Sequence, residues 1–497
     1  MKICSYVLIF LVLLTALSSC YKEVVVFNAE PNSRLELPTI LRINQKECCY
    51  DHTRNSLRFP IEHSTVVDFS PFIEHQDYST IYFDGKLLVN GEFNNLGTVE
   101  TNKEYTVIIE TSDSSKEFLL TFTDLPIVQI ITPNSITDDP KTIGRIIVNY
   151  AELDRESDQY FIGLEHRGGS SLAYQKKSIG CSLKGSVDLD DDVSNSFFDM
   201  KSNNDWILDA MWVDKARIRN LTSFELWKSM GGVDHFGIEG RVVELYMNND
   251  HQGVYSLNEN INTEWLSHSS VPDVLYKAVE WESGATRFET YVDNPSSSAY
   301  WDGWEQKHPD PQMEINWEPL NSLRRHVVNE TDEVFVENIS SKIELDLFVD
   351  YYLFLNLVSA ADNTGKNTFL YRESGEEKFN LIPWDLDGSW GLDWDGAHVG
   401  FTTILSNHLF DRLLETNAGD FRNKVKLRWS ALRSDVFSNA GLENLFTHNF
   451  NLVGASGVIQ IENDSWGSAI DIEQEQDYLF EWLEGRLPFL DAYFESL

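Results

Sequence analysis

The sequence predicts a mixed α+β protein in which a small all-β domain precedes a larger domain with a β-rich first half and a helical second half. Two observations predict this order. Short β-rich runs separated by turn dipeptides fill residues 20–125, and long helical patterns dominate after about residue 310. The length of 497 residues leaves room for two or three domains with a substantial core.

Residues 1–19 have the pattern of a secretory signal. Lys2 precedes an apolar run over 3–14, which is too short for a comfortable transmembrane helix. The following Leu17-Ser18-Ser19-Cys20 resembles a bacterial lipobox, so Cys20 is expected to be the lipidated first residue of the mature chain. An ordinary signal peptide cut nearby is the alternative. Because Tyr21-Lys22-Glu23 after the cysteine has no Asp at the second position, we expect an extracytoplasmic protein anchored to the outer membrane of a bacterium.

Residues 20–125 are predicted to form a β-sandwich of immunoglobulin type. Turn signals such as Asp84-Gly85 and Asn90-Gly91 separate the runs. The predicted strands are Glu23–Phe27, Tyr78–Phe83, Glu104–Ile109 and Glu117–Phe122. No residue pattern in this domain indicates chemistry, which favours a spacer or a binding module.

Residues 126–497 form the second predicted domain. Its β-rich half contains strand-like runs at 127–131, 145–148, 160–164 and 177–183, a helix from Asp214 to Met230 and a hairpin over 241–257. The turn-rich stretch Asp293–Pro311 is predicted to be a surface loop. The later helices are predicted at 316–328, 343–360, 407–415, 419–434 and 470–494.

The charge of the chain argues against nucleic-acid binding. Lys and Arg number 39 against 79 Asp and Glu, which gives a formal net charge of −40. So acidic a protein repels nucleic acid and anionic membrane surfaces at long range. The charge itself locates no site.

Two acidic segments in the helical half carry the strongest chemical signal. Asp362 and Asn367 are five positions apart after a predicted helix, and Asp385 and Asp387 end the apolar run that begins at Phe379. Phosphoryl transfer from ATP uses a carboxylate at the attacking hydroxyl, with an amide and a second carboxylate at the metal. An Asp-x-Asp pair also serves metal-dependent glycosyltransferases, so this pair alone does not choose between the two reactions.

Two segments of the β-rich half could hold phosphates. Arg167-Gly168-Gly169-Ser170-Ser171 could present backbone amides to an anion, although a tight hairpin also explains it. In a strand, Lys177 shares a face with apolar residues and Lys176 faces solvent. Glu225, on the predicted helix, is the partner expected for an inward Lys177. The alternatives are a Lys177 that reaches solvent and a Glu225 paired on its own helix.

The region from about 126 to 497 resembles the spore coat protein H (CotH) family of atypical secreted protein kinases. The matching pieces, in chain order, are Arg167–Ser171 with Lys176–Ser178, Asp205–Leu208 with Arg217–Asn220, Gln252–Leu257 with Glu259, Leu275–Lys277, Asp362–Asn367 and Ile382–Asp387. The N-terminal β domain falls outside the match.

The resemblance implies a kinase-like two-lobed fold, with a β-rich N-lobe and a helical C-lobe, that phosphorylates Ser or Thr of secreted proteins. ATP and Mg²⁺ or Mn²⁺ are the implied cofactors. By position, Asp362 corresponds to the catalytic acid, Asn367 and Asp385 to metal ligands, and Lys177 with Glu225 to the phosphate-orienting pair. Lys176 and Glu259 compete for the last two roles.

Two other classes of function remain open. A nucleotide-sugar transferase would use Asp385 and Asp387 for its metal but has no need of an inward Lys177. A non-catalytic adhesive lipoprotein would keep the fold and tolerate the loss of Asp362. The intact set of acids disfavours the adhesive alternative.

Overall fold

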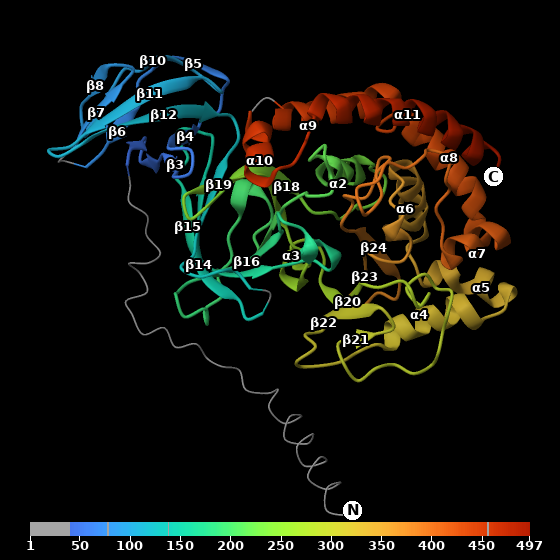
Figure 1. The fold of residues 1–497 in the computed structure, drawn as a ribbon. Helices are drawn as coiled ribbons and strands as arrows, with labels where there is room; N and C mark the ends of the chain where they lie inside the picture. The colour runs from blue at the N-terminus through green and yellow to red at the C-terminus, as the bar shows by residue number, and fades with distance from the viewer. Residues whose placement is uncertain (1–39, 77–78, 138, 455–456) are drawn as a thin grey trace, which may run out of the picture.

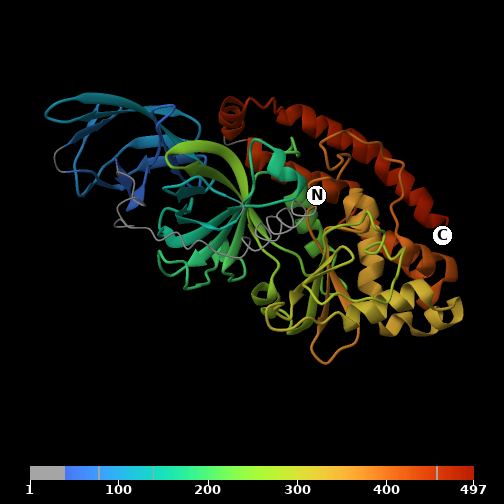
Figure 2. The same cartoon turned by 60° about the horizontal axis from the view of Figure 1, so that its bottom comes forward.

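The computed structural model describes residues 40–76, 79–137, 139–454 and 457–497. The chain has a mixed α+β structure with N-terminal sheets, a β-barrel and a second sheet embedded in helices, and its C-terminal helices run back toward the barrel (Figures 1 and 2). The predicted signal, Cys20 and the predicted strand at 23–27 lie outside the described residues. Among the described helices, none is both long and apolar enough to cross a membrane.

Within residues 40–126, every regular element of the described part is a strand. Three sheets form, with strand orders β2-β1-β6-β9, β10-β5 and β3-β4-β12-β11-β7-β8. The strands are β1 (Arg42–Ile43), β2 (Lys46–Glu47), β3 (Cys49–Asp51), β4 (Ser56–Pro60), β5 (Thr65–Phe69), β6 (Phe72–Glu74), β7 (Thr80–Phe83), β8 (Lys86–Leu88), β9 (Glu92–Phe93), β10 (Gly97–Glu100), β11 (Glu104–Glu110) and β12 (Ser115–Thr123). A buried ion pair, Arg58 to Glu244 at 2.6 Å, joins these sheets to the barrel.

A closed barrel follows, in the order β13-β14-β15-β16-β17-β19-β18. Its strands are β13 (Ile127–Ile131), β14 (Thr142–Asn149), β15 (Asp158–His166), β16 (Ile179–Lys184), β17 (Asp205–Asp209), β18 (Gly240–Met247) and β19 (Asp250–Glu259). Closure comes from the parallel pairing of β13 with β18. A barrel has no open sheet edge, and inward residues such as Leu164, Cys181 and Leu257 fill this one.

A second sheet, in the order β21-β22-β20-β23-β24, lies against the helices. Its strands are β20 (Pro272–Ala278), β21 (Tyr300–Trp301), β22 (Trp304–His308), β23 (Thr368–Glu373) and β24 (Phe379–Pro383). The stretch predicted as a surface loop at 293–311 therefore contributes two strands, and the indoles of Trp301 and Trp304 are buried. The prediction of a loop was wrong because burial of these rings outweighs the local turn signals.

The helices surround one that is almost entirely buried. Every residue of this helix, α6 (Leu345–Val358), is buried except Asp346, and the helix leads directly to the segment around Asp362. The others are α2 (Arg219–Ser229), α3 (Thr263–Ser267), α4 (Glu318–Asn329), α5 (Asp332–Asn338), α7 (His408–Thr416), α8 (Phe421–Arg433), α9 (Asn439–Gly454), α10 (Val458–Trp466) and α11 (Ile472–Glu495). Of these, α10 returns to the barrel and packs on β19 (Figure 1).

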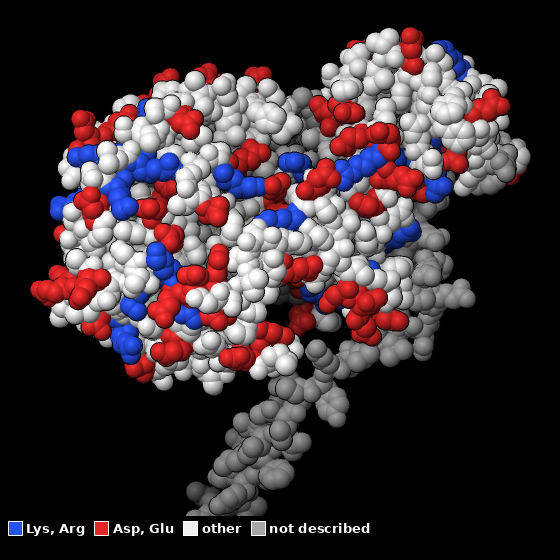
Figure 3. Space-filling model, turned by 180° about the vertical axis from the view of Figure 1, so that it is seen from behind, with Lys and Arg blue, Asp and Glu red and all other residues white. Residues whose placement is uncertain are grey.

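The acidic charge of the chain is dispersed over the face seen in Figure 3. Red acidic side chains lie among blue basic ones there, without one continuous acidic patch. This distribution agrees with a solvated surface rather than with a single charged binding face.

Candidate active site

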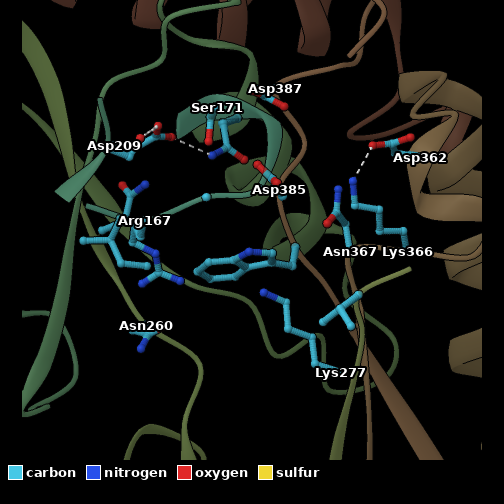
Figure 4. A pocket seen from close by; sticks show the side chains of 18 of the residues that line it. Arg167, Ser171, Asp209, Asn260, Lys277, Asp362, Lys366, Asn367, Asp385 and Asp387 are labelled. Carbon is cyan, nitrogen blue, oxygen red and sulfur yellow. Dashed lines mark hydrogen bonds and ion pairs between the residues drawn. The ribbon is translucent and has the colours of Figure 1, made fainter. Parts of the chain in front are cut away.

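A large cavity lies between the barrel and the second sheet. Its volume is about 1020 Å³, and both halves of the protein line it. The barrel side contributes Arg167, Gly168, Gly169 and Asp209, whereas the other side contributes Lys277, Asp362, Asn367, Asp385 and Asp387 (Figure 4). Cavities of this size hold drug-sized or nucleotide-sized ligands.

The segment that follows α6 places Asp362 and Asn367 at the cavity. The helix stops at Ser359, which has a left-handed φ of 59°, and a short 3-10 turn at Asp362–Thr364 follows. The amide of Asn363 donates to the carbonyls of Asn367 (3.0 Å) and Trp384 (2.8 Å), which ties the turn to the end of β24. The turn is therefore held at both ends, and Asp362 pairs with Lys366 at 3.5 Å.

Asp385 and Asp387 leave the end of β24 and face the cavity. Enclosure within the cleft and the nearby carboxylate of Asp209 raise the pKa of Asp385, although its side chain is open to the water of the cavity. Burial and the charge of Asp385 raise the pKa of Asp387 well above its usual range. Carboxylates that repel one another in this way gain stability from a cation.

Sequence reasoning missed Asp209, the last residue of β17. Its carboxylate accepts from the hydroxyl of Ser178 (3.1 Å), the backbone N–H of Met211 (3.0 Å) and the amide of Asn220 (3.1 Å). The same Asn220 accepts from the backbone N–H of Leu386 at 3.0 Å. Asn220 therefore links a barrel carboxylate to the Asp385–Asp387 segment. The available signal was the alternation of Asp205, Ile207 and Asp209 along one strand face.

The donor set fits a hard divalent cation with few protein ligands. In the described residues, no group of three or more His, Cys, Asp or Glu side chains is arranged to hold a metal ion. Mg²⁺ in nucleotide sites is held by one or two carboxylates and completes its shell with phosphate oxygens and water. Asp385, with the amide oxygen of Asn367, supplies this kind of partial shell.

Two cations face the acids from opposite walls. Arg167 comes from the barrel and Lys277 from β20, and neither side chain has a hydrogen-bond or ion-pair partner among the described residues. Burial and the nearby Arg167 lower the pKa of Lys277 to about 8. Burial also lowers the pKa of Arg167. Unpaired, partly desolvated cations favour an anionic ligand.

The pairing predicted for Lys177 and Glu225 is not formed. Lys177 bonds the carbonyl of Leu172 and does not line the cavity. Glu225 accepts from the amide of Asn449 on α9 at 2.7 Å. The prediction failed because β16 begins at Ile179, so strand alternation does not apply to residues 176 and 177.

Lys176, which was predicted to face solvent, is buried and paired with Glu462 of α10. Its ammonium lies 3.0 Å from the Glu462 carboxylate, and neither side chain is exposed. Arg217 contacts the same carboxylate at 2.6 Å. The other competitor, Glu259, accepts three N–H groups rather than a lysine. Lys176 therefore stabilises the wall of the cavity and is not free to bind phosphate.

The glycines of the loop between β15 and β16 lie at the cavity, as an anion-binding loop requires. Gly168 has a φ of 115°, and a Cβ there would lie 1.8 Å from the Ser171 hydroxyl oxygen. A larger residue at 168 would be strained by this φ and would require the Ser171 side chain to move. Arg167 and Ser171 of the same loop also line the cavity.

These features define a mixed α+β protein with one cavity in which a loop acid, an amide and a strand-end acid face two cations. Neither cation has a hydrogen-bond or ion-pair partner among the described residues. The chain belongs to the family described as CotH kinase protein, which it matches over residues 164–490. It is similar to the inner spore coat protein H of Bacillus subtilis (strain 168), with 21% identity over 374 residues, 73% of this chain and 93% of that protein. The predicted resemblance is thereby confirmed.

Two solved structures show weaker likeness. The Helicobacter pylori proinflammatory kinase CtkA has 9% identity and a TM-score of 0.29, covering 64% of this chain and 94% of its own. HipA, from the Shewanella oneidensis MR-1 toxin–antitoxin complex, has 10% identity and a TM-score of 0.27, covering 64% of this chain and 60% of that chain. At such TM-scores neither structure bears on the function.

Proposed function

We propose that this protein transfers the γ-phosphoryl group of ATP to a Ser or Thr hydroxyl of a protein outside the cytoplasm, with Mg²⁺ or Mn²⁺ as the metal. The proposal rests on one observation. Asp362, Asn367 and Asp385 line the same cavity as two cations, Arg167 and Lys277, that have no hydrogen-bond or ion-pair partner among the described residues. Membership of the CotH kinase protein family supports it. In this proposal the barrel acts as the N-lobe and the second sheet with its helices as the C-lobe.

Each residue has a separate task in the proposed reaction. When bound, the metal supplies positive charge that offsets the charge on the transferred group. Asp385 and Asn367 would hold that metal, while Lys277, Arg167 and the amides of the glycine loop would orient the phosphates. Asp362 would hold the acceptor hydroxyl and take up its proton. The ion pair with Lys366 keeps the Asp362 carboxylate oriented.

Nucleotide binding tests the proposal directly. We expect ATP with Mn²⁺ to raise the melting temperature of the whole chain, and labelled ATP to leave phosphate on the protein or on an added substrate. At a ligand concentration of 100 times Kd, the free energy of unfolding rises by about 2.7 kcal/mol. A shift with UDP-glucose and none with ATP would favour glycosyl transfer instead.

Lys277→Met should remove most of the ATP-dependent shift, because it removes a cation that faces the acids. Lys177→Met is the matched control, since its ammonium bonds a backbone carbonyl outside the cavity and its loss should leave the shift unchanged. A larger loss of the ATP-dependent shift in Lys177→Met than in Lys277→Met would indicate that Lys177, and not Lys277, binds the phosphates.

Location is a separate proposal. We propose that the chain is held at a membrane through lipid on Cys20, a residue outside the described part of the structure. Cys20→Ser should then move the protein from the membrane fraction into a soluble extracytoplasmic fraction. Retention of the variant in membranes would contradict lipid anchoring at this residue.

A further inference from the structure

The chain that joins the barrel to the second sheet passes along the cavity. It runs from the end of β19 at Glu259 to the start of α3 at Thr263 and carries Asn260, whose side chain lines the cavity (Figure 4). Asn260 lies on the barrel side, away from Asp362. A ligand whose phosphates reach the acids would extend its other end toward this connection.

The backbone of this connection is fixed. The Glu259 carboxylate accepts three N–H groups: the backbone of Lys201 (2.6 Å), the backbone of Glu239 (2.9 Å) and the indole of Trp265 (2.8 Å). Asn203 donates to the backbone carbonyl of Asn260 at 2.8 Å. Asn262 caps α3 by accepting from the backbone N–H of Trp265 at 2.8 Å. The neighbouring polar groups are therefore used within the protein.

The side-chain amide of Asn260 is the exception. It is half-buried, it lines the cavity, and it has no hydrogen-bond partner among the described residues. Apolar side chains line the same cavity from both halves of the protein, namely Ile207, Ile261 and Phe369. A flat heterocycle between such walls would present its polar edge to the amide.

We propose that the Asn260 amide binds the hydrogen-bonding edge of a purine base, so that the side chain at position 260 decides whether the cavity discriminates between adenine and guanine nucleotides. The inference rests on the proposed function. An amide offers one acceptor and one donor group. Adenine presents a donor beside an acceptor, so both bonds can form. Guanine presents N1–H beside O6, and an amide turned over can pair with these atoms as well.

A carboxylate at this position would change the preference. Asp only accepts hydrogen bonds at neutral pH, so it suits the two adjacent donors of guanine, N1–H and the 2-amino group, and repels the N1 lone pair of adenine. Asn260→Asp should therefore raise the ratio of Kd for ATP to Kd for GTP by about 10-fold or more. Asn260→Ser should raise the Kd for both nucleotides about 5-fold, which corresponds to the loss of about one hydrogen bond.

Calorimetric titration of the full chain with non-transferable imido analogues of ATP and GTP, in the presence of Mn²⁺, measures these ratios. Asn329→Asp is the control, because it adds the same charge on an exposed residue at the end of α4. It should leave both affinities unchanged. A ratio within 2-fold of wild type for Asn260→Asp would overturn the inference, as would unchanged affinities for Asn260→Ser if the Asp variant does not fold. Failure of the folded wild type to bind either analogue would instead reject the proposed function.

Discussion

Asp385→Asn is expected to abolish both the ATP-dependent thermal shift and all phosphoryl transfer. Asp385 faces the cavity at the end of β24, and enclosure and the nearby carboxylate of Asp209 raise its pKa. A metal–nucleotide complex would relieve this unfavourable charge. Loss of the carboxylate should therefore weaken binding of the metal–ATP complex itself. Calorimetric titration with ATP and Mn²⁺ measures the loss.

Asp362→Asn should separate binding from reaction. Asp362 is proposed to hold the acceptor hydroxyl, a contact that matters mainly in the transfer step. The variant should keep most of the ATP-dependent shift and lose transfer by about 10²-fold or more. Asp395→Asn provides the control, because among the described residues this exposed acid bonds only a backbone N–H of its own turn, and it does not line the cavity. Equal loss of binding in the Asp362 and Asp385 variants would make Asp362 a metal ligand.

Glu462→Gln is expected to destabilise the fold by about 3–5 kcal/mol, the usual cost of leaving buried charges without their partner. The Glu462 carboxylate contacts Lys176 at 3.0 Å and Arg217 at 2.6 Å, and it accepts the backbone N–H of Val254 at 2.9 Å. Arg217 in turn bonds the carbonyls of Trp212 and Asp214 in the segment that follows Asp209. The variant should therefore loosen a wall of the cavity as well as α10.

Urea unfolding of the whole chain measures this loss, and its pH dependence has a defined sign. Burial alone would raise the pKa of Glu462, but Lys176 and Arg217 outweigh it and hold the pKa below the usual 4.5. A lowered folded-state pKa stabilises the protein above the unfolded pKa, and this stability is lost as pH falls through the folded value. The difference in the free energy of unfolding between wild type and variant should therefore have its full size at pH 7 and shrink below about pH 4.

The control for this experiment lies two residues along the same helix. Asp464 is exposed, and its one side-chain hydrogen bond within the described part of the chain comes from Gln460 on the same helix. Asp464→Asn should change the free energy of unfolding by less than about 0.5 kcal/mol. An equally small effect of Glu462→Gln would show that the buried pair contributes nothing beyond its own desolvation cost.

Local signals predicted much of the fold. The strand at Ile127–Ile131 has the predicted bounds, and α4, α6, α7, α8 and α11 differ from the predicted helices by one to two residues at each end. The order of elements followed from periodicity, which depends on each segment's own residues. The helix predicted from Asp214 begins only at Arg219, yet Asp214 still accepts the backbone N–H groups of Ile218 and Arg219.

Local residue patterns were enough to find the segments that carry chemistry: the Asp362–Asn367 spacing, the acids after β24 and the glycines after Arg167 each follow from residue types and short spacings. Which cations face those acids depends on contacts between segments that are far apart in the sequence. Lys176 and Lys177 are neighbours, and Lys277 is a hundred residues away, so no local pattern ranks them. Lys176 is buried because Glu462, from a helix near the other end of the chain, compensates its charge at 3.0 Å. Lys277 has no hydrogen-bond or ion-pair partner among the described residues, although its ammonium lies over the rings of Phe369 and Trp384. It lines the cavity together with the barrel residues because of long-range packing, which creates the cavity and its charge.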